Sequence, residues 1–310
     1  MQEYFFANYR LLIDDEISKH ESMQYLSAFK NRMPYEHTFT LYWGNPDLLE
    51  EKYQEAMTTP LLCTALQVDI RKSKNGWFIV HPKRDVDEIK SFLYVMECSE
   101  DYNEMTLYAP TEEIYYEQFD ISIKPVVPFQ SVIRVGCETG MVFHNGFPIH
   151  ASLIEKDGYG VLFVGPSGMG KSTQAKLWEK YQGAEFINGD RPGICFKDGK
   201  WYGFGMPWDG KDRIYKQKMV PIKAVVSLEQ APENHIHMVD QREAMRILLR
   251  QVMMPMWDED AMNYLTDMMM KFIIDIPFYH LKNLPNEGAI RLTYEELWKE
   301  KLMDEGIFIS

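Results

Sequence analysis

Cysteine is scarce in this sequence. The chain has 310 residues and four cysteines, Cys63, Cys98, Cys137 and Cys195, which lie far apart. No two of them form a Cys-x-x-Cys pair and none lies in a cluster with histidine, which argues against a zinc finger or a disulfide framework. We expect reduced, mostly buried thiols, as in a cytoplasmic protein.

Positive charge and long apolar runs are also in short supply. The 33 Lys and Arg residues are outnumbered by 46 Asp and Glu residues, which gives a net charge of -13. Such a surface repels nucleic acid and anionic lipid, so we expect neither as a partner. No apolar run approaches the roughly 18 residues that a membrane span needs, and the amino terminus lacks a basic region followed by an apolar core. The sequence therefore predicts no membrane span and no export signal.

The most informative segment present is residues 165–173, Gly-Pro-Ser-Gly-Met-Gly-Lys-Ser-Thr. It satisfies the phosphate-binding loop pattern of glycine, four free positions and Gly-Lys-Ser/Thr. The continuous apolar run 159–164 before it predicts a buried strand, and residues 171–182 after it have helical spacing with Gly183 as a stop. Strand, loop and helix therefore follow one another in the order that phosphate binding requires.

The residue types in this loop suit a triphosphate. Glycines let the backbone turn its N–H groups toward an anion, and the start of the helix adds its positive dipole end. Lys171 is expected to reach the β and γ phosphates, and the Ser172 hydroxyl to ligate Mg²⁺. The candidate nucleotide-binding residues are Gly165, Ser167, Gly168, Met169, Gly170, Lys171, Ser172 and Thr173. A glycine-rich turn without function is the alternative, although such a turn needs neither the lysine nor this spacing.

A second signal follows the predicted helix. Residues 186–192, Phe-Ile-Asn-Gly-Asp-Arg-Pro, put Asp190 at the end of a short apolar strand. In phosphate-loop folds a strand beside the loop strand usually delivers an aspartate to the metal or to the attacking group. Asp190 is therefore expected to hold Mg²⁺ with Ser172 or to accept the proton of a hydroxyl. An Asx turn after the strand stays open as the plainer interpretation.

Three cations and one tryptophan are further candidates. Arg191, Lys211 and Arg213 could stabilise charge on a transferring phosphoryl group, with Arg213 the preferred residue, or they are ordinary surface cations. Trp208 lies in a loop rich in proline and glycine, where it either covers the acceptor or the base or anchors the loop.

The pattern along the chain predicts two domains. Residues 1–125 carry short alternating bursts, such as 4–13 and 77–80, typical of a β-rich mixed domain, and the prolines of 124–128 suggest the boundary. Residues 126–310 are expected to form an α/β phosphate-loop domain with a mixed sheet.

Hairpin and capping signals support that second domain. The dipeptides Asn145-Gly146 and Asp157-Gly158 predict hairpins that feed the loop strand from an antiparallel meander. Asp240 is expected to cap a helix over 241–253, and Thr293 to cap another over 294–302.

The chain resembles the catalytic domain of HPr kinase/phosphorylase and, more distantly, ATP-dependent phosphoenolpyruvate carboxykinase. The resemblance covers about residues 150–210. It rests on Ile149-His150-Ala151-Ser152, the Gly-x-Ser-Gly-x-Gly-Lys-Ser loop and the Asn-Gly-Asp-Arg segment that ends at Arg191. It implies ATP and Mg²⁺, phosphoryl transfer to a serine-like hydroxyl, and Asp190 as the catalytic carboxylate. His150 matches a histidine near the phosphate site of that family, where it could assist proton movement; a strand histidine packed among its neighbours is equally consistent.

The chain also departs from the family pattern. Gly189 replaces the first of two adjacent acids, which argues against a second metal and against the reverse, phosphorolytic reaction. A stronger resemblance is to bacterial HPr kinase-like proteins in which Asn-Gly-Asp-Arg-Pro is followed by Gly-x-Pro-Trp, here residues 205–208. The HPr-recognition segment is not recognisable after residue 210, so HPr is not assigned as the substrate. Because family members commonly associate through the kinase domain, the resemblance implies a homo-oligomer.

The leading hypothesis is an ATP- and Mg²⁺-dependent kinase that acts on a serine-like hydroxyl of a peptide, protein or small molecule. Two alternatives stay open. Asp190-Arg-Pro-Gly193 matches the Asp-x-x-Gly string of nucleotide switches, although no Asn-Lys-x-Asp segment is present to read guanine. A non-catalytic module that keeps ATP for stability or assembly is the second alternative.

Overall fold

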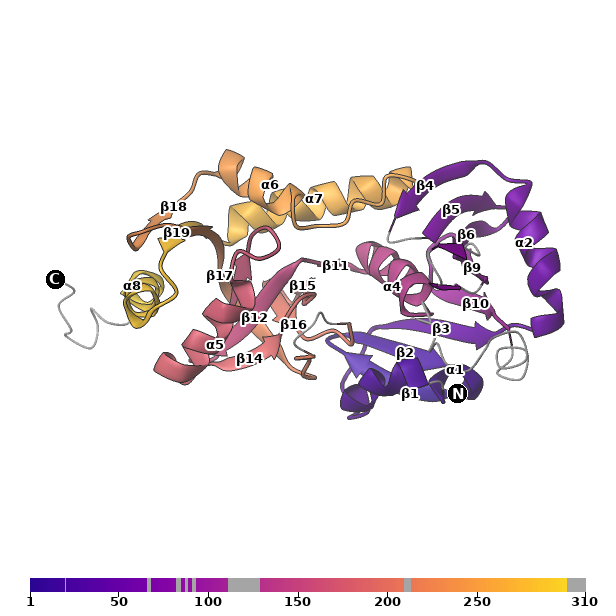
Figure 1. Cartoon of the computed structure of the whole chain (residues 1–310), viewed down its shortest axis with the longest axis horizontal. Helices are drawn as coiled ribbons and strands as arrows, with labels where there is room; N and C mark the ends of the chain where they lie inside the picture. The colour runs from indigo at the N-terminus through magenta and orange to yellow at the C-terminus, as the bar shows by residue number, and fades with distance from the viewer. Residues whose placement is uncertain are drawn as a thin grey trace. The chain divides into compact units, whose positions relative to one another are not determined.

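The computed structural model describes residues 1–19, 21–65, 68–81, 85–86, 89–90, 93–110, 129–208 and 213–299. The chain has a mixed α/β architecture with two large mixed sheets (Figure 1). It divides into two compact units, Met1–His144 with Pro255–Met262, and Asn145–Met254 with Asn263–Ser310. The predicted domain boundary at residue 125 lies outside the described residues, and the functional division into two domains stays a prediction. No helix in the described ranges has the length and apolarity needed to cross a bilayer.

The first unit is organised around an eight-stranded sheet of order β1-β2-β3-β10-β9-β6-β5-β4. Its strands are β1 Gln2–Phe6, β2 Tyr9–Ile13, β3 His37–Trp43, β4 Leu61–Ala65, β5 Val68–Ser73, β6 Gly76–His81, β9 Tyr94–Ser99 and β10 Glu104–Tyr108. The β2–β3 and β3–β10 pairs are parallel and the others antiparallel. β7 Asp85–Val86 and β8 Ile89–Lys90 form a separate two-stranded ribbon. The β-rich character predicted for this region is confirmed.

Two helices of this unit pack on the eight-stranded sheet. The helical segments are α1 Asp15–Ser18, η1 Glu21–Phe29, η2 Pro46–Leu48, α2 Leu49–Met57, α4 Phe129–Gly140 and η3 Met141–His144. α2 lies over Phe78 and Val95, whereas Gly136 of α4 lies close to Met96 and Met105. Since neighbouring side chains of a strand point to opposite faces, Val95 and Met96 place the two helices on opposite faces of the sheet.

The second unit is built on a nine-stranded sheet whose main path is β11-β15-β16-β17-β13-β12-β14. Its strands are β11 Gly146–Pro148, β12 Ala151–Lys156, β13 Tyr159–Val164, β14 Glu185–Asn188, β15 Gly193–Lys197, β16 Lys200–Phe204, β17 Met219–Gln230, β18 His235–Met238 and β19 Phe278–Asn283. β13 runs parallel to β17, which also runs parallel to β19, and the other neighbours are antiparallel. The predicted mixed sheet is therefore confirmed.

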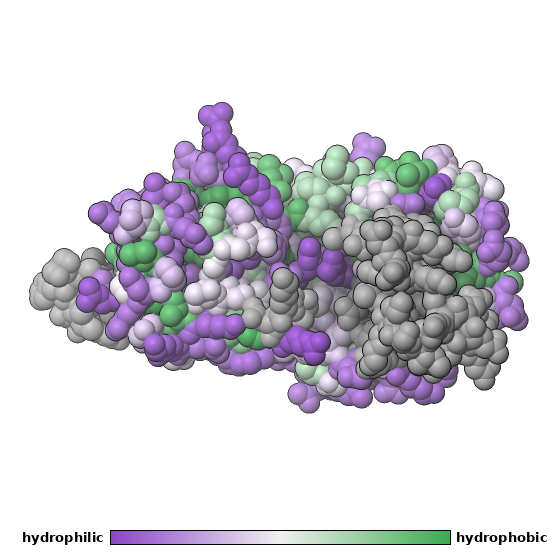
Figure 2. All heavy atoms as spheres, viewed as in Figure 1, coloured by the Kyte–Doolittle hydropathy of each residue, from purple (hydrophilic) through white to green (hydrophobic). Residues whose placement is uncertain are grey.

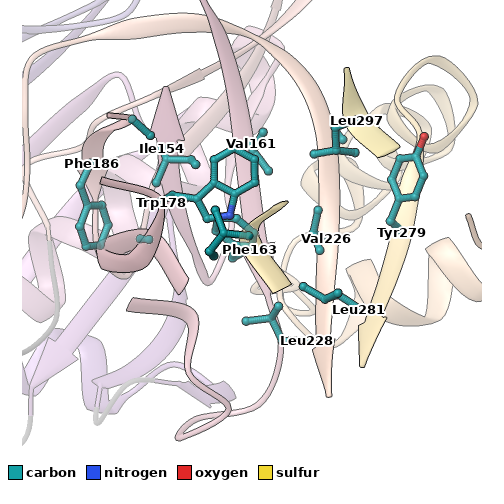
Figure 3. Packing of buried hydrophobic residues seen from close by; sticks show 14 of the residues in the cluster. Ile154, Val161, Phe163, Trp178, Phe186, Val226, Leu228, Tyr279, Leu281 and Leu297 are labelled. Carbon is teal, nitrogen blue, oxygen red and sulfur yellow. The ribbon is translucent and has the colours of Figure 1, made fainter. Parts of the chain in front are cut away.

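Helices cover both faces of this sheet. They are α5 Lys171–Gln182, α6 Gln241–Leu249, α7 Glu259–Asp275 and α8 Glu287–Leu297. On one face, Trp178 of α5 lies among Val161, Phe163 and side chains of α8, as Figure 3 shows. On the other face, Phe272 of α7 packs edge-on against Phe278 at 5.8 Å between ring centroids. Apolar burial on both faces explains why β13 reads as a continuous apolar run.

Several local predictions are confirmed by the structure. β13, α5 and the stop at Gly183 lie where the sequence places them, with Gly183 in the left-handed conformation that ends the helix. The hairpin at Asp157-Gly158 is present between β12 and β13. Asp240 caps α6 by accepting a hydrogen bond from the Glu243 amide, although α6 ends at Leu249 rather than at residue 253. All four cysteines are free thiols and three are buried.

The burst 4–13 forms β-structure as predicted, in two strands joined by a turn at Ala7, which has a positive φ of 51°. Two other local predictions are wrong. Asn145-Gly146 does not close a hairpin, since β11 pairs with the distant β15. Thr293 lies inside α8, where its hydroxyl donates to the Ala289 carbonyl, and Asn286 caps the helix instead. A threonine that returns its hydroxyl to the preceding turn is not distinguishable by sequence from one that caps.

Candidate functional site

The loop between β13 and α5 is held open by glycines. Gly168 and Gly170 have φ values of +81° and +95°, in the left-handed region that glycine enters without steric strain. A Cβ added to Gly168 would meet nothing within 4 Å, so this position requires glycine for its backbone angle and not for lack of space. The loop glycines predicted from the motif therefore have a structural reason in this chain.

The amides at the start of α5 are available to a ligand. Gly170 is the N-cap residue and has no side chain to bond them. Within the described ranges, the N–H groups of Gly170, Lys171, Ser172 and Thr173 donate no hydrogen bond. Unpaired amides and the positive end of a 12-residue helix make a site that favours an anion.

Lys171 lies folded over the loop. Its side chain is buried, with only 8% of the residue exposed, and Nζ donates to the Gly165 carbonyl at 2.9 Å and to the Pro166 carbonyl at 3.3 Å. Burial lowers the pKa of Lys171, and the nearby charge of Asp190 opposes that shift. A buried cation is surrounded by a low effective dielectric, so it attracts a bound anion more strongly than an exposed lysine does.

Asp190 and His150 form a pair close to the loop. His150 Nε2 lies 3.3 Å from Asp190 Oδ1, and about a third of each side chain is exposed. The hydrogen bond from His150 is the main reason that the pKa of Asp190 is lowered, and the charges of His150, Arg191 and Lys171 act in the same direction. Asp190 is therefore an ionised carboxylate within the electrostatic range of Lys171.

The place of Asp190 in the sheet differs from the prediction. The strand before it, β14, pairs with β12 and not with the loop strand β13. One strand therefore separates the two motifs. The Ala151 amide at the start of β12 donates to the Asp190 carbonyl at 3.0 Å, which ties the Asp190 turn to the strand between the motifs.

Asn188 shapes the Asp190 turn and was not singled out from the sequence. Its Oδ1 accepts from the amides of Asp190 at 3.1 Å and Arg191 at 2.8 Å, which is an Asx turn. Its Nδ2 donates to the carbonyls of Met206 at 3.1 Å and Trp208 at 3.4 Å, and the side chain is fully buried. The Asx turn, raised above as an alternative to function, thus belongs to Asn188 and positions Asp190.

Gln251 is a second residue that the sequence did not reveal. With its amide turned so that Nε2 faces the two acceptors, Nε2 donates to the His150 carbonyl at 3.1 Å and to the Gly165 carbonyl at 3.3 Å. Its own carbonyl accepts from the His150 amide at 2.8 Å. A single buried side chain thus links the first residue of the loop to the residue that bonds Asp190.

The remaining candidates that the structure describes differ in their exposure and in their contacts with the loop and Asp190. Ser167 and Thr173 are exposed, Met169 and Ser172 are partly buried, and Arg191 adds positive charge near Asp190. Trp208 is buried. Lys211 lies outside the described residues. Arg213 is exposed with a φ of 50°, and in the part of the chain described it has no hydrogen bond or ion pair to the loop or to Asp190.

The oxygen donors present suit magnesium only in part. Ser172 stands in the first turn of α5 and Asp190 offers a carboxylate, and both are hard oxygen ligands. No cluster of three or more His, Cys, Asp or Glu side chains in the described ranges could hold a metal ion by itself. This set fits a Mg²⁺ that arrives with phosphates and keeps several waters, which is the usual mode for nucleotide sites.

Comparisons with known proteins identify no family. No family model matches the chain, and no curated protein matches it. A solved structure to which the chain is similar is the Hpr(Ser) kinase/phosphatase from Coxiella burnetii, at 14% sequence identity over 51% of this chain and 93% of that one, with a TM-score of 0.31. A similarity of this size supports no assignment, so the roles proposed below rest on the residues of this chain.

Proposed function

We propose that this chain binds ATP with magnesium in the loop between β13 and α5 and transfers the γ-phosphoryl group to a hydroxyl of an acceptor. The observation that carries the proposal is a convergence of groups in one unit. Unpaired amides at the start of α5, the buried Lys171 and the ionised Asp190 lie within mutual electrostatic range. A glycine-rich turn without function has no need of the lysine or of the carboxylate.

In this proposal Lys171 and the loop amides bind the phosphates. Lys171 Nζ exchanges its two carbonyl contacts for phosphate oxygens, while the amides from Gly170 to Thr173 bond oxygens at the start of the helix. Because these donors are already in place, little reorganisation is needed as charge develops on the phosphoryl group. Magnesium held by Ser172, Asp190 and the phosphates would neutralise part of that charge.

Asp190 orients the acceptor hydroxyl for in-line attack. Its lowered pKa makes it a weak base, which the reaction tolerates because phosphoryl transfer passes through a loose transition state that asks little of the base. His150 donates to the carboxylate and fixes its direction, and so acts as a positioning residue. Arg213 and Lys211 stay predictions as cations near the transferring group.

The test separates binding from transfer. Labelled ATP is incubated with the chain and with free serine, peptides or cell extract, and phosphorylated products are identified. Asp190→Asn is expected to keep ATP binding within about threefold while acceptor-dependent ADP formation falls at least about 100-fold. The matched control is Asp198→Asn, in the exposed turn between β15 and β16. It should leave both ATP binding and ADP formation unchanged.

Two results would overturn the proposal in different ways. Full turnover by Asp190→Asn removes Asp190 from the chemistry. Tight ATP binding without ADP formation for any acceptor favours the non-catalytic module.

A further inference from the structure

A groove lies between α6 and α7 in the second unit. Its volume is about 380 Å³, and its lining includes Arg242, Met245, Arg246, Met270, Ile273 and Ile274. The volume lies within the range of roughly 300–1,000 Å³ for ligand sites, and the floor is apolar with cations on the α6 side. Figure 2 shows hydrophobic and hydrophilic surface next to each other over α6 and α7.

The apolar side of the groove is open to solvent. Met270 is 48% exposed and Ile274 is 62% exposed, and they stand one turn apart on α7. Neighbouring exposed apolar side chains on one helix face mark a surface that a partner covers. Methionines such as Met245 and Met270 adapt their shape, which is why they recur at peptide-binding surfaces.

The α6 side of the groove is cationic. Arg242, Arg246 and Arg250 recur every four residues and so form a stripe along one face of α6 and its C-cap. Arg246 shares its charge with Glu243 at 3.2 Å, whereas no acid in the described ranges pairs with Arg242 or Arg250. On a chain with a net charge of -13 this stripe is a local reversal of sign. Two copies that met through identical stripes would repel, so the surface favours a partner of opposite charge.

The stripe leads toward the candidate site. Arg250 is the C-cap of α6, and the next residue, Gln251, bonds Gly165 of the loop and His150. From Arg242 to Arg250 the axis advances about 12 Å at 1.5 Å per residue. A segment seated in the groove would therefore bring its neighbouring residues toward Asp190.

We propose that the groove docks an amphipathic helical segment of a protein acceptor. Apolar residues at i, i+3, i+4 and i+7 of the segment fill the space over Met270 and Ile274, and flanking Asp or Glu side chains pair with Arg242 and Arg246. This inference rests on the proposed kinase function. It identifies the acceptor as a protein with an acidic amphipathic segment rather than free serine or another small molecule.

The test is reciprocal charge reversal with the full-length chain. The probes are two fluorescein-labelled helical peptides with the same leucine pattern and one serine beyond the helix, one flanked by glutamates and the other by lysines. The wild type should bind the glutamate peptide at least about tenfold more tightly than the lysine peptide, and added salt should weaken that preference. Arg242→Glu with Arg246→Glu should reverse it, and Arg242→Gln with Arg246→Gln should abolish it.

Two further variants separate packing from charge. Met270→Ser with Ile274→Ser should weaken binding of both peptides. Arg291→Glu replaces an arginine on α8 whose side chain is 77% exposed, and it should change neither. Thermal unfolding by circular dichroism verifies that each variant folds.

Several outcomes overturn the inference. Equal affinity for the two peptides, no binding, or a preference that survives charge reversal each contradict the docking surface. Self-association that disappears in Met270→Ser with Ile274→Ser would assign the groove to a second copy instead. Peptide binding and ADP formation are measured separately. ADP formation without peptide binding contradicts the docking surface alone, and peptide binding without ADP formation contradicts the proposed kinase function alone.

Discussion

Two turns of the second unit, 165–173 and 188–192, differ in how many of their polar groups are hydrogen-bonded. The loop at 165–173 leaves a row of amides unpaired in the described structure and bends its lysine back onto its own carbonyls. The turn at 188–192 is saturated, because Asn188 makes four hydrogen bonds from a fully buried position. Unpaired polar groups destabilise a fold unless something binds them, whereas a saturated turn stabilises it. One turn therefore leaves backbone donors without a partner in the described structure, whereas the other fixes the backbone of Asp190.

The largest expected effect tests the saturated turn. Asn188→Ala should lower the free energy of unfolding by about 3–4 kcal/mol, because buried amides and carbonyls lose their partner and a small cavity forms. Urea denaturation measures the change. Asn234 makes two hydrogen bonds at the exposed surface and serves as the control. Asn234→Ala should lower the free energy of unfolding by less than about 1 kcal/mol. If the two variants lose equal stability, the turn is not the rigid element described here.

The second prediction tests the open turn. Lys171→Ala should weaken ATP binding about 100-fold, which corresponds to about 2.7 kcal/mol, as measured by titration calorimetry. The free energy of unfolding should change by less than about 1 kcal/mol, because the lost carbonyl contacts are offset by relief of a buried charge. Lys180→Ala removes an exposed lysine of the same helix and serves as the control. Unaltered affinity in Lys171→Ala would show that the loop does not bind triphosphate.

The third prediction joins the two turns. Gln251→Leu keeps the size of the side chain but removes the donor that faces His150 and Gly165. We expect ATP affinity and turnover each to fall by about tenfold, since small displacements of positioned groups reduce rates. Gln182→Leu at the end of α5 is the matched control. Wild-type ATP affinity and turnover in Gln251→Leu would show that the loop keeps its shape without the hydrogen bonds of Gln251.

The smallest expected effect concerns pH. The pKa of Asp190 is lower in the folded chain than the unfolded value of about 3.9, so its stabilising contribution is present above that value and is lost as pH falls through the folded pKa. A third of the side chain is exposed, so the contribution should be below about 1 kcal/mol. Unfolding of wild type and Asp190→Asn is compared at pH 6 and at about pH 2.5. A stability difference that does not narrow at low pH would contradict the ion pair.

Local features of the site could be predicted from sequence, and its assembly could not. The strand 159–164, the helix 171–182 and the stop at Gly183 follow from apolar runs, helical spacing and a left-handed glycine, all of which act between near neighbours. Gln251 carried no signal, because a single glutamine 86 positions after Gly165 becomes informative only once α6 is packed. The predicted position of β14 beside the loop strand was wrong for the same reason. Strand order depends on contacts across the whole sheet, and β14 pairs with β12.

By itself the sequence determined where a glycine-rich turn joins a buried strand to a helix, and which lysine and aspartate accompany it. Those features depend on backbone angles and short-range periodicity, which neighbouring residues dictate. Only the tertiary structure decided that His150, Asp190, Lys171 and Gln251 meet, because their approach requires β12 to pair with both β13 and β14 and the segment after α6 to return to the loop. Long-range pairing is selected by burial of the shared core rather than by any one residue.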